Sequence, residues 1–231
     1  IETHDDSFDV EASPRLFVVS FNGAITVEAS LDGKVRVNAT VRRADMVEYR
    51  VEQEGNTITV IAAEDARTTG KSPGADIVVA APAGTTVKLT TSNGPIVVRG
   101  IEQSGNVETS NGPIELSGSR GTFVANTINA HITVNNAVGN VFLETSNGPI
   151  NFSGELTVGG RNVMKTSNGS IDIVLQGTPS ILVDATTRNG TIRSDVPIQT
   201  SSTKSTKLDG TIGSGEANLT METSNGSIVI R

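Results

Sequence analysis

The sequence predicts an all-β fold, a parallel β-helix (β-solenoid) with about 18–21 residues in each coil. The first observation is a six-residue motif, Thr-Ser-Asn-Gly-Pro-Ile, which occurs intact at residues 91–96, 109–114 and 145–150. The second is its spacing: the turn residue is asparagine at 93, 111, 129, 147, 168, 189 and 225 and aspartate at 209. A repeat of this length indicates stacked structural units, because each coil must lie on the last at the strand spacing of about 4.8 Å.

Apolar and polar residues alternate within each repeat, and the same residue types recur at the same positions of successive repeats. Alternation of period two combined with fixed columns predicts a narrow apolar core along one axis. Three columns form the candidate corner and core of the coil. They are the corner residues Asn93, Asn111, Asn129, Asn147, Asn168, Asn189 and Asn225; the threonines Thr91, Thr109, Thr127, Thr145, Thr166 and Thr187; and the isoleucines Ile96, Ile114, Ile132, Ile150, Ile171, Ile192, Ile212 and Ile228.

Eighteen residues divide into three faces of about six, so a three-sided coil is the first interpretation and a flatter two-sided coil the second. No stretch has helical periodicity. Asn and Gly at the corners suggest left-handed backbone conformations, which these residues tolerate in tight bends. We therefore expect about eight coils with an Asn-Gly corner.

The chain is expected to form a single domain, with N-terminal strands and a cap over residues 1–80 and regular coils over residues 81–231. Asn22-Gly23 joins two alternating runs, and Gly55 lies between two more; both patterns are typical of hairpin turns. Residues 228–231 close the chain as an apolar strand with no visible cap. An uncovered solenoid edge presents unpaired backbone groups and predicts self-association through this C-terminal end.

Composition excludes several classes of function. The chain has 18 basic and 25 acidic side chains, which argues against a nucleic-acid partner. Cysteine is absent, so no thiolate metal site or Cys nucleophile exists, and no cofactor is expected. No apolar run approaches the roughly 20 residues of a membrane span. The chain begins at Ile1 rather than Met, so we expect a mature or trimmed form without its targeting segment.

The two polar columns each have a structural and a functional interpretation. The threonines share the side of the apolar columns, so their hydroxyls should bond to backbone groups at the corner; the alternative is a flat Thr face that binds ice. The asparagines should form a ladder in which each amide contacts the next coil; the alternative is a polar edge that binds a linear glycan. His4 and His131 are the histidines of this chain, and both are interpreted as surface residues.

A β-helix also raises the question of a polysaccharide lyase or hydrolase. Glycosidases need two carboxylates about 5 to 10 Å apart. Glu108 and Glu144 share a column two coils apart, since 144 − 108 is twice the 18-residue period, with Lys165 one coil further on. Sugar clefts favour aromatic platforms, and the chain has no Trp and only Tyr49 as tyrosine. We therefore predict no catalytic residues and keep the carbohydrate-active enzyme as the alternative.

The repeated Thr-Ser-Asn-Gly-x-Ile unit, the run Ile-Val-Val-Ala-Ala-Pro at 77–82 and Asn22-Gly23-x-Ile25-x-Val27 resemble the bacterial putative-adhesin family of β-solenoid domains. The resemblance covers roughly residues 16–231. It implies a right-handed parallel β-helix that is often exported or tethered at the cell envelope, and some members are linked to envelope-stress regulation. The family is itself largely of unknown function and supplies no catalytic residues.

Together these observations predict a non-enzymatic adhesion or scaffold domain of the bacterial cell envelope or extracellular space. Its partner would be a cell-surface glycan or protein, bound through the faces or ends of the solenoid. A self-associating structural module is a third hypothesis, beside the carbohydrate-active enzyme.

Overall fold

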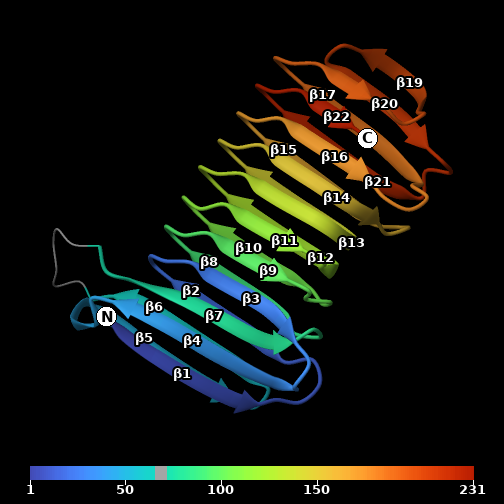
Figure 1. Ribbon diagram of the computed structural model, residues 1–231. Coiled ribbons are helices and arrows are strands. Elements are labelled where there is room, and N and C mark those ends of the chain that lie inside the picture. Colours follow the sequence, from blue (N-terminus) through green and yellow to red (C-terminus); the bar gives the residue numbers. More distant parts are fainter. Residues whose placement is uncertain (66–71) are drawn as a thin grey trace.

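The computed structural model describes residues 1–65 and 72–231, and at 202 and 203 the backbone alone. Strands stack into an elongated body with two long faces around a narrow core (Figure 1). Each coil runs up one face, turns at the Asn-Gly corner and runs down the other. For example, β8 (Thr86–Thr91) is followed by β9 (Ile96–Arg99). In the next coil β10 (Gly105–Thr109) pairs in parallel with β8, and β11 (Ile114–Ser117) with β9.

We call the two faces A and B. In spatial order, face A consists of β5 (Val47–Glu54), β6 (Thr57–Glu64), β2 (Arg15–Ser20), β8, β10, β12 (Arg120–Thr127), the second half of β13 (Ile132–Thr145), β15 (Arg161–Thr166), β21 (Ala217–Thr223), β17 (Ile181–Thr187), β20 (Lys207–Ile212) and β19 (Gln199–Lys204). Face B consists of β1 (Glu2–Asp9), β4 (Lys34–Arg42), β7 (Gly74–Pro82), β3 (Ile25–Ser30), β9, β11, the first half of β13, β14 (Ile150–Leu156), β16 (Ile171–Leu175), β22 (Ile228–Ile230) and β18 (Ile192–Ser194). A single 3-10 turn, η1 (Ala44–Met46), is the one helical element in the described part of the chain.

Each coil contributes two strands, so the three-sided interpretation is wrong and the flat two-sided one describes the fold. The third segment of the coil is irregular at residues 100–104 between β9 and β10, whereas in β13 it is a bulge within one continuous strand. It still contributes to the core through Ile101, which is fully buried. Five residues are too few for a strand that must also turn at both ends, so this segment serves as the second corner.

The N-terminal strands join the coil stack rather than only capping it. β2 and β3 do not pair with each other: β2 lies between β6 and β8, and β3 lies between β7 and β9, all in parallel. The hairpin expected at Asn22-Gly23 is therefore wrong, because this turn is a solenoid corner. The hairpin expected around Gly55 is confirmed by the antiparallel pairing of β5 with β6. At this end the stack finishes on the antiparallel strands β5 and β1.

The C-terminal end differs from the expectation in two ways. Residues 207–212, interpreted as a coil with its corner at Asp209, form strand β20, which runs antiparallel to both β17 and β19. The last coil, β21–β22, lies between the coils β15–β16 and β17–β18. The prediction of an open C-terminal edge is therefore wrong, because Ile228–Ile230 has a parallel partner on each side. The basis for self-association through this strand is lost.

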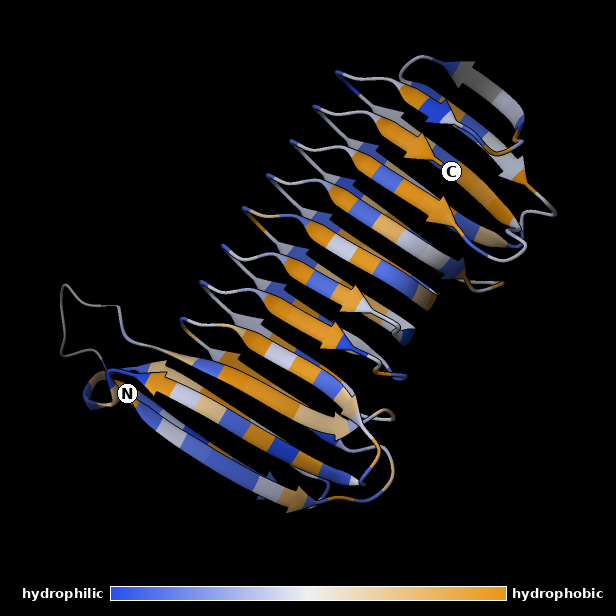
Figure 2. Ribbon diagram, in the orientation of Figure 1, coloured by the Kyte–Doolittle hydropathy of each residue, from blue (hydrophilic) through white to orange (hydrophobic). Residues whose placement is uncertain are grey.

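The core is a continuous column of apolar side chains between the faces, and hydrophobic residues alternate with polar ones along the strands (Figure 2). Ile96, Ile114, Ile132, Ile150, Ile171 and Ile228 are all fully buried. Ile192 is partly buried, because β18 ends face B and has a neighbour on one side alone. Because each coil contributes one strand to each face, a substitution in this column also changes the packing against the coils on both sides.

Candidate functional site

The corner asparagines form a continuous hydrogen-bonded ladder on the outside of the solenoid. Each side-chain amide donates to the Oδ1 atom of the asparagine in the preceding coil. The bonds run Asn189→Asn225 at 2.8 Å, Asn225→Asn168 at 2.8 Å, Asn168→Asn147 at 2.9 Å, Asn147→Asn129 at 2.9 Å, Asn129→Asn111 at 2.7 Å and Asn111→Asn93 at 2.7 Å. The ladder follows the spatial order of the coils, so Asn225 stands between Asn168 and Asn189. All seven residues are exposed.

The threonine column lies just inside the corner, and its hydroxyls donate to backbone carbonyls of the neighbouring coil. The bonds are Thr91→Gly23 at 3.2 Å, Thr109→Gly94 at 3.1 Å, Thr127→Gly112 at 3.0 Å, Thr145→Ala130 at 2.8 Å, Thr166→Gly148 at 2.9 Å, Thr187→Gly226 at 2.8 Å and Thr223→Gly169 at 2.8 Å. All seven threonines are buried. Inward hydroxyls that are already bonded cannot order water on a surface, so the column does not offer an ice-binding face.

The glycine after the corner asparagine is required by space rather than by a left-handed backbone. None of the corner asparagines has a positive φ, so the left-handed conformation expected from the sequence is wrong at these residues, whereas the second corner does contain it, for example at Gly100 (φ 69°) and Gly139 (φ 150°). At Gly112 an added Cβ would instead overlap the carbonyl oxygen of Gly94 in the preceding coil. Successive corners approach each other so closely that any side chain at this position would separate them.

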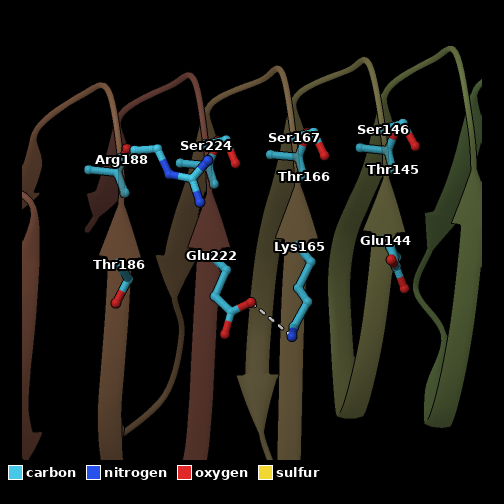
Figure 3. Close-up of a pocket in the computed structure, with 12 residues that line it drawn as sticks. Glu144, Thr145, Ser146, Lys165, Thr166, Ser167, Thr186, Arg188, Glu222 and Ser224 are labelled. Atoms are coloured by element: carbon cyan, nitrogen blue, oxygen red, sulfur yellow. Dashed lines mark ion pairs between the residues drawn. The ribbon is translucent and has the colours of Figure 1, made fainter.

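An open groove, here called the corner groove, runs beside the asparagine ladder on the outer surface of face A (Figure 3). It crosses β13, β15, β21 and β17 and has a volume of about 540 Å³. Its lining is polar throughout and repeats from coil to coil: Glu144, Thr145, Ser146, Lys165, Thr166, Ser167, Thr186, Thr187, Arg188, Glu222, Thr223 and Ser224. Because the lining comes from two outward columns and the threonine column between them, the groove runs along the solenoid axis.

The charges in the corner groove are partly paired. Lys165 Nζ lies 2.8 Å from Glu222 Oε2 on the adjacent coil, in the middle of the groove. Arg188 occupies the position that is serine in most other coils and reaches across towards Ser224 (Figure 3). Within the part of the chain that the structure describes, Arg188 and Glu144 make no ion pair. The groove therefore offers an unpaired cation and an unpaired anion on a hydroxyl-rich floor.

A smaller hollow of about 270 Å³ continues the same two columns towards the N-terminus. It is lined by Thr90, Thr91, Ser92, Glu108, Thr109, Ser110, Asn126, Thr127 and Ile128. Ile128 replaces serine in its column and is half-exposed, so it stands at the boundary between the two hollows. The polar surface beside the ladder thus extends over most of the length of the stack.

The carboxylates considered for catalysis lie in one outward column, on coils that are not adjacent. Glu108 pairs in register with Asn126 and Asn126 with Glu144, which separates the two carboxylates by two coil steps, near 10 Å. The ammonium of Lys165 is bonded to Glu222 rather than placed between the two acids. Among the described residues no group of three or more His, Cys, Asp and Glu side chains could hold a metal ion.

The histidines lie away from the corner groove floor. His131 is exposed on the turn before β13. His4 is partly buried at the N-terminal end, where its ring centroid lies 4.5 Å from that of Tyr49 and its Nε2 atom 3.3 Å from Glu2. The surface position expected for His4 is therefore only partly correct, because β1 and β5 face each other across the end of the core.

Sequence reasoning missed two residues beside the corner groove, Arg188 and Phe142. Arg188 interrupts the serine column, a signal that was visible in the alignment of the repeats. Phe142 points outward on face A, between the buried Val141 and Leu143. Its outward position follows from the alternation of buried and partly buried residues in β13, and a phenylalanine ring can serve as an aromatic platform as Trp and Tyr can.

Fold and site together define a flat, two-sided β-solenoid with a polar groove along one corner. No helix in the described ranges, 1–65 and 72–231, is long and apolar enough to cross a membrane. The Toastrack DUF4097 family matches residues 69–231, and the chain belongs to this family.

The solved structures to which this chain is similar are distant from it in sequence. A putative adhesin from Bacteroides fragilis is 11% identical, with 100% of this chain and 97% of that chain covered and a TM-score of 0.53. A putative cell adhesion protein from Clostridium sporogenes is 12% identical over 99% of both chains, with a TM-score of 0.46. A putative lipid binding protein from Parabacteroides distasonis is 12% identical over 99% of this chain and 96% of that chain, with a TM-score of 0.39. At these identities the first likeness establishes a shared fold alone. The comparison with curated proteins found no match.

Proposed function

We propose that this chain is a non-enzymatic adhesion or scaffold domain of the bacterial cell envelope, exported from the cytoplasm, which binds an elongated partner along the corner groove. The observation that carries the proposal is the shape and composition of that groove. It is open, crosses four coils and is lined by hydroxyls and a few charges. Such a surface suits a partner that lies along the solenoid axis and contacts one coil after another.

The solenoid gives this surface rigidity. Each corner is tied to the next by an Asn–Asn bond and a Thr–carbonyl bond, for example Asn129→Asn111 and Thr127→Gly112. A rigid surface loses little conformational entropy on binding, which favours affinity from many weak contacts. The adhesin descriptions of the structural relatives are consistent with this role.

We also propose that the whole chain acts as one domain, in which residues 1–80 close one end and residues 81–231 carry the binding coils. Right-handed winding is proposed on the general preference of parallel strand crossovers for that hand. Neither feature is needed for the binding model, but both define how the groove would be presented at the envelope.

The test is co-sedimentation with insoluble bacterial cell walls and with insoluble polysaccharides, with an assay for sugar released into the supernatant. Retention without release is the expected result. Release of sugar would favour the carbohydrate-active enzyme and would direct attention to Glu144 and Glu108. If the chain is retained on none of these materials, the result would contradict adhesion and leave a scaffold with a protein partner.

A further inference from the structure

Three apolar side chains stand in a row on the outer surface of face A. Val124, Phe142 and Val163 belong to adjacent coils and are paired in register, Val124 with Phe142 and Phe142 with Val163. Each lies between two buried residues of its strand and therefore points outward. We call this row the apolar strip. Its members are partly buried because each packs against the next, which leaves one flat apolar band along the axis.

The apolar strip runs directly beside the corner groove. Phe142 precedes Glu144 by two residues, and Val163 precedes Lys165 by two, so each pair lies on the same side of its strand. Two residues along a strand correspond to roughly 6.6 Å. A ligand about one ring wide can therefore contact the strip with one side and the groove floor with the other.

The charges of the groove select the class of ligand. Glu144 and Glu222 are balanced by Lys165 and Arg188, so the lining carries no net charge at neutral pH. A polyanion or a polycation would leave like charges facing each other. Ser146, Ser167 and Ser224 instead supply hydroxyls that both donate and accept hydrogen bonds.

From this juxtaposition we propose that the apolar strip and the corner groove together form a binding site for a neutral, linear polysaccharide. A sugar ring has an apolar face of C–H groups and a rim of hydroxyls. The face would lie on Phe142 and its valine neighbours, and the rim would bond to Glu144, Lys165 and the serines. The proposal rests on the adhesion role proposed above and adds the chemical class of the ligand and the side of the molecule that binds it.

The experiment is affinity gel electrophoresis of the whole chain in gels that contain hydroxyethyl cellulose, mixed-linkage β-glucan or glucomannan as neutral linear probes. Gels with polygalacturonate or alginate serve as polyanionic probes. At least one neutral probe is expected to retard the protein, and the polyanions are not. Phe142→Ala should weaken the apparent affinity for that probe roughly five- to ten-fold, the size expected for loss of a ring contact.

Phe17→Ala is the matched control. Phe17 is also a partly buried phenylalanine that points outward on face A, but it lies between Thr59 and Lys88, three coil steps or roughly 14 Å from Val124. Its substitution should leave retardation unchanged. Phe142→Leu keeps most of the apolar volume without the ring and provides a second variant if the alanine variant does not fold. Circular dichroism melting curves establish that each variant is folded.

Equal loss in the Phe142 and Phe17 variants, or no loss in either Phe142 variant, would overturn the proposed site. Retardation by the polyanions alone would overturn the assignment of a neutral ligand. If no soluble polysaccharide retards the protein while cell walls still sediment it, this inference fails and the adhesion role stands. If walls also fail to sediment it, both this inference and the adhesion role fail, and the scaffold with a protein partner is left.

Discussion

Asn225 donates its side-chain amide to Oδ1 of Asn168 at 2.8 Å, although 57 residues separate the two in the chain. The residues between them include the outer coil β17–β18 and the hairpin β19–β20. The chain thus forms the outer coil and the capping hairpin first. It then returns and inserts the coil β21–β22 between the coils β15–β16 and β17–β18. The same construction occurs at the other end, where β2–β3 lies between β6–β7 and β8–β9.

The interior position of the last strand predicts a large effect of Ile228→Ala. Ile228 is fully buried and pairs with Ile171 on one side and Ile192 on the other. The substitution should reduce the free energy of unfolding by about 2–5 kcal/mol, the range for large-to-small changes in a core. Urea unfolding followed by circular dichroism measures it.

Val229→Ala on the same strand is the control. The Val229 side chain points outward, so the variant should lose less than about 1 kcal/mol of unfolding free energy. Similar small losses for both variants would mean that β22 frays at a free edge.

The asparagine ladder predicts a graded loss of stability. Asn129 takes part in two ladder bonds, donating to Asn111 and accepting from Asn147. Asn93 ends the ladder and takes part in one, as an acceptor from Asn111. Since a net hydrogen bond contributes about 0.5–1.5 kcal/mol, Asn129→Ala should lose about twice as much unfolding free energy as Asn93→Ala. Equal losses in thermal and urea unfolding would show that the ladder bonds do not stabilise the corner.

The close approach of successive corners predicts that Gly112→Ala is far more damaging than Gly118→Ala. The new methyl group at 112 would overlap the carbonyl oxygen of Gly94, so the coils must separate. We expect a loss above about 3 kcal/mol, in the upper part of the range for single substitutions. Gly118 has a φ of 58° and open space around its Cβ position, so alanine there should cost about 1–2 kcal/mol through backbone strain alone. Comparable melting temperatures of the two variants would contradict the steric explanation.

Tyr49 predicts a decline in stability at alkaline pH. Burial, with a smaller contribution from Asp6, raises the pKa of Tyr49 to about 12, whereas an unperturbed tyrosine has a pKa of about 10. Between these values the unfolded chain loses the phenolic proton and the folded chain keeps it, so unfolding becomes more favourable as pH rises. Tyr49→Phe should therefore show a shallower loss of stability than the unsubstituted chain in urea titrations between pH 9 and pH 12.

At neutral pH the same substitution should be neutral or stabilising by up to about 1 kcal/mol. The Tyr49 hydroxyl is buried and has no hydrogen-bond partner among the described residues, so phenylalanine removes an unsatisfied polar group. A clear destabilisation at pH 7 would indicate that the hydroxyl is bonded in solution.

Much of the corner could be predicted from the repeat. The Thr, Asn and Ile columns recur in most coils, and their side of the strand follows from alternation. Phe142 could have been placed on the outer face by the same argument. The reason for the corner glycine could not be predicted from the sequence, because it depends on the distance between Gly112 and Gly94 in different coils.

The sequence by itself determined the all-β class, the length of a coil, the residues of its corner and the side of each strand that faces the core. These properties are local, since they depend on a period of two within a strand and on the turn between two strands. The tertiary structure alone decided the order of the coils, the antiparallel caps and the pairing of both edges of β22. The coils carry nearly the same corner motif and can replace one another as neighbours. Their order is therefore set by which arrangement pairs the backbone groups of every level across the whole stack.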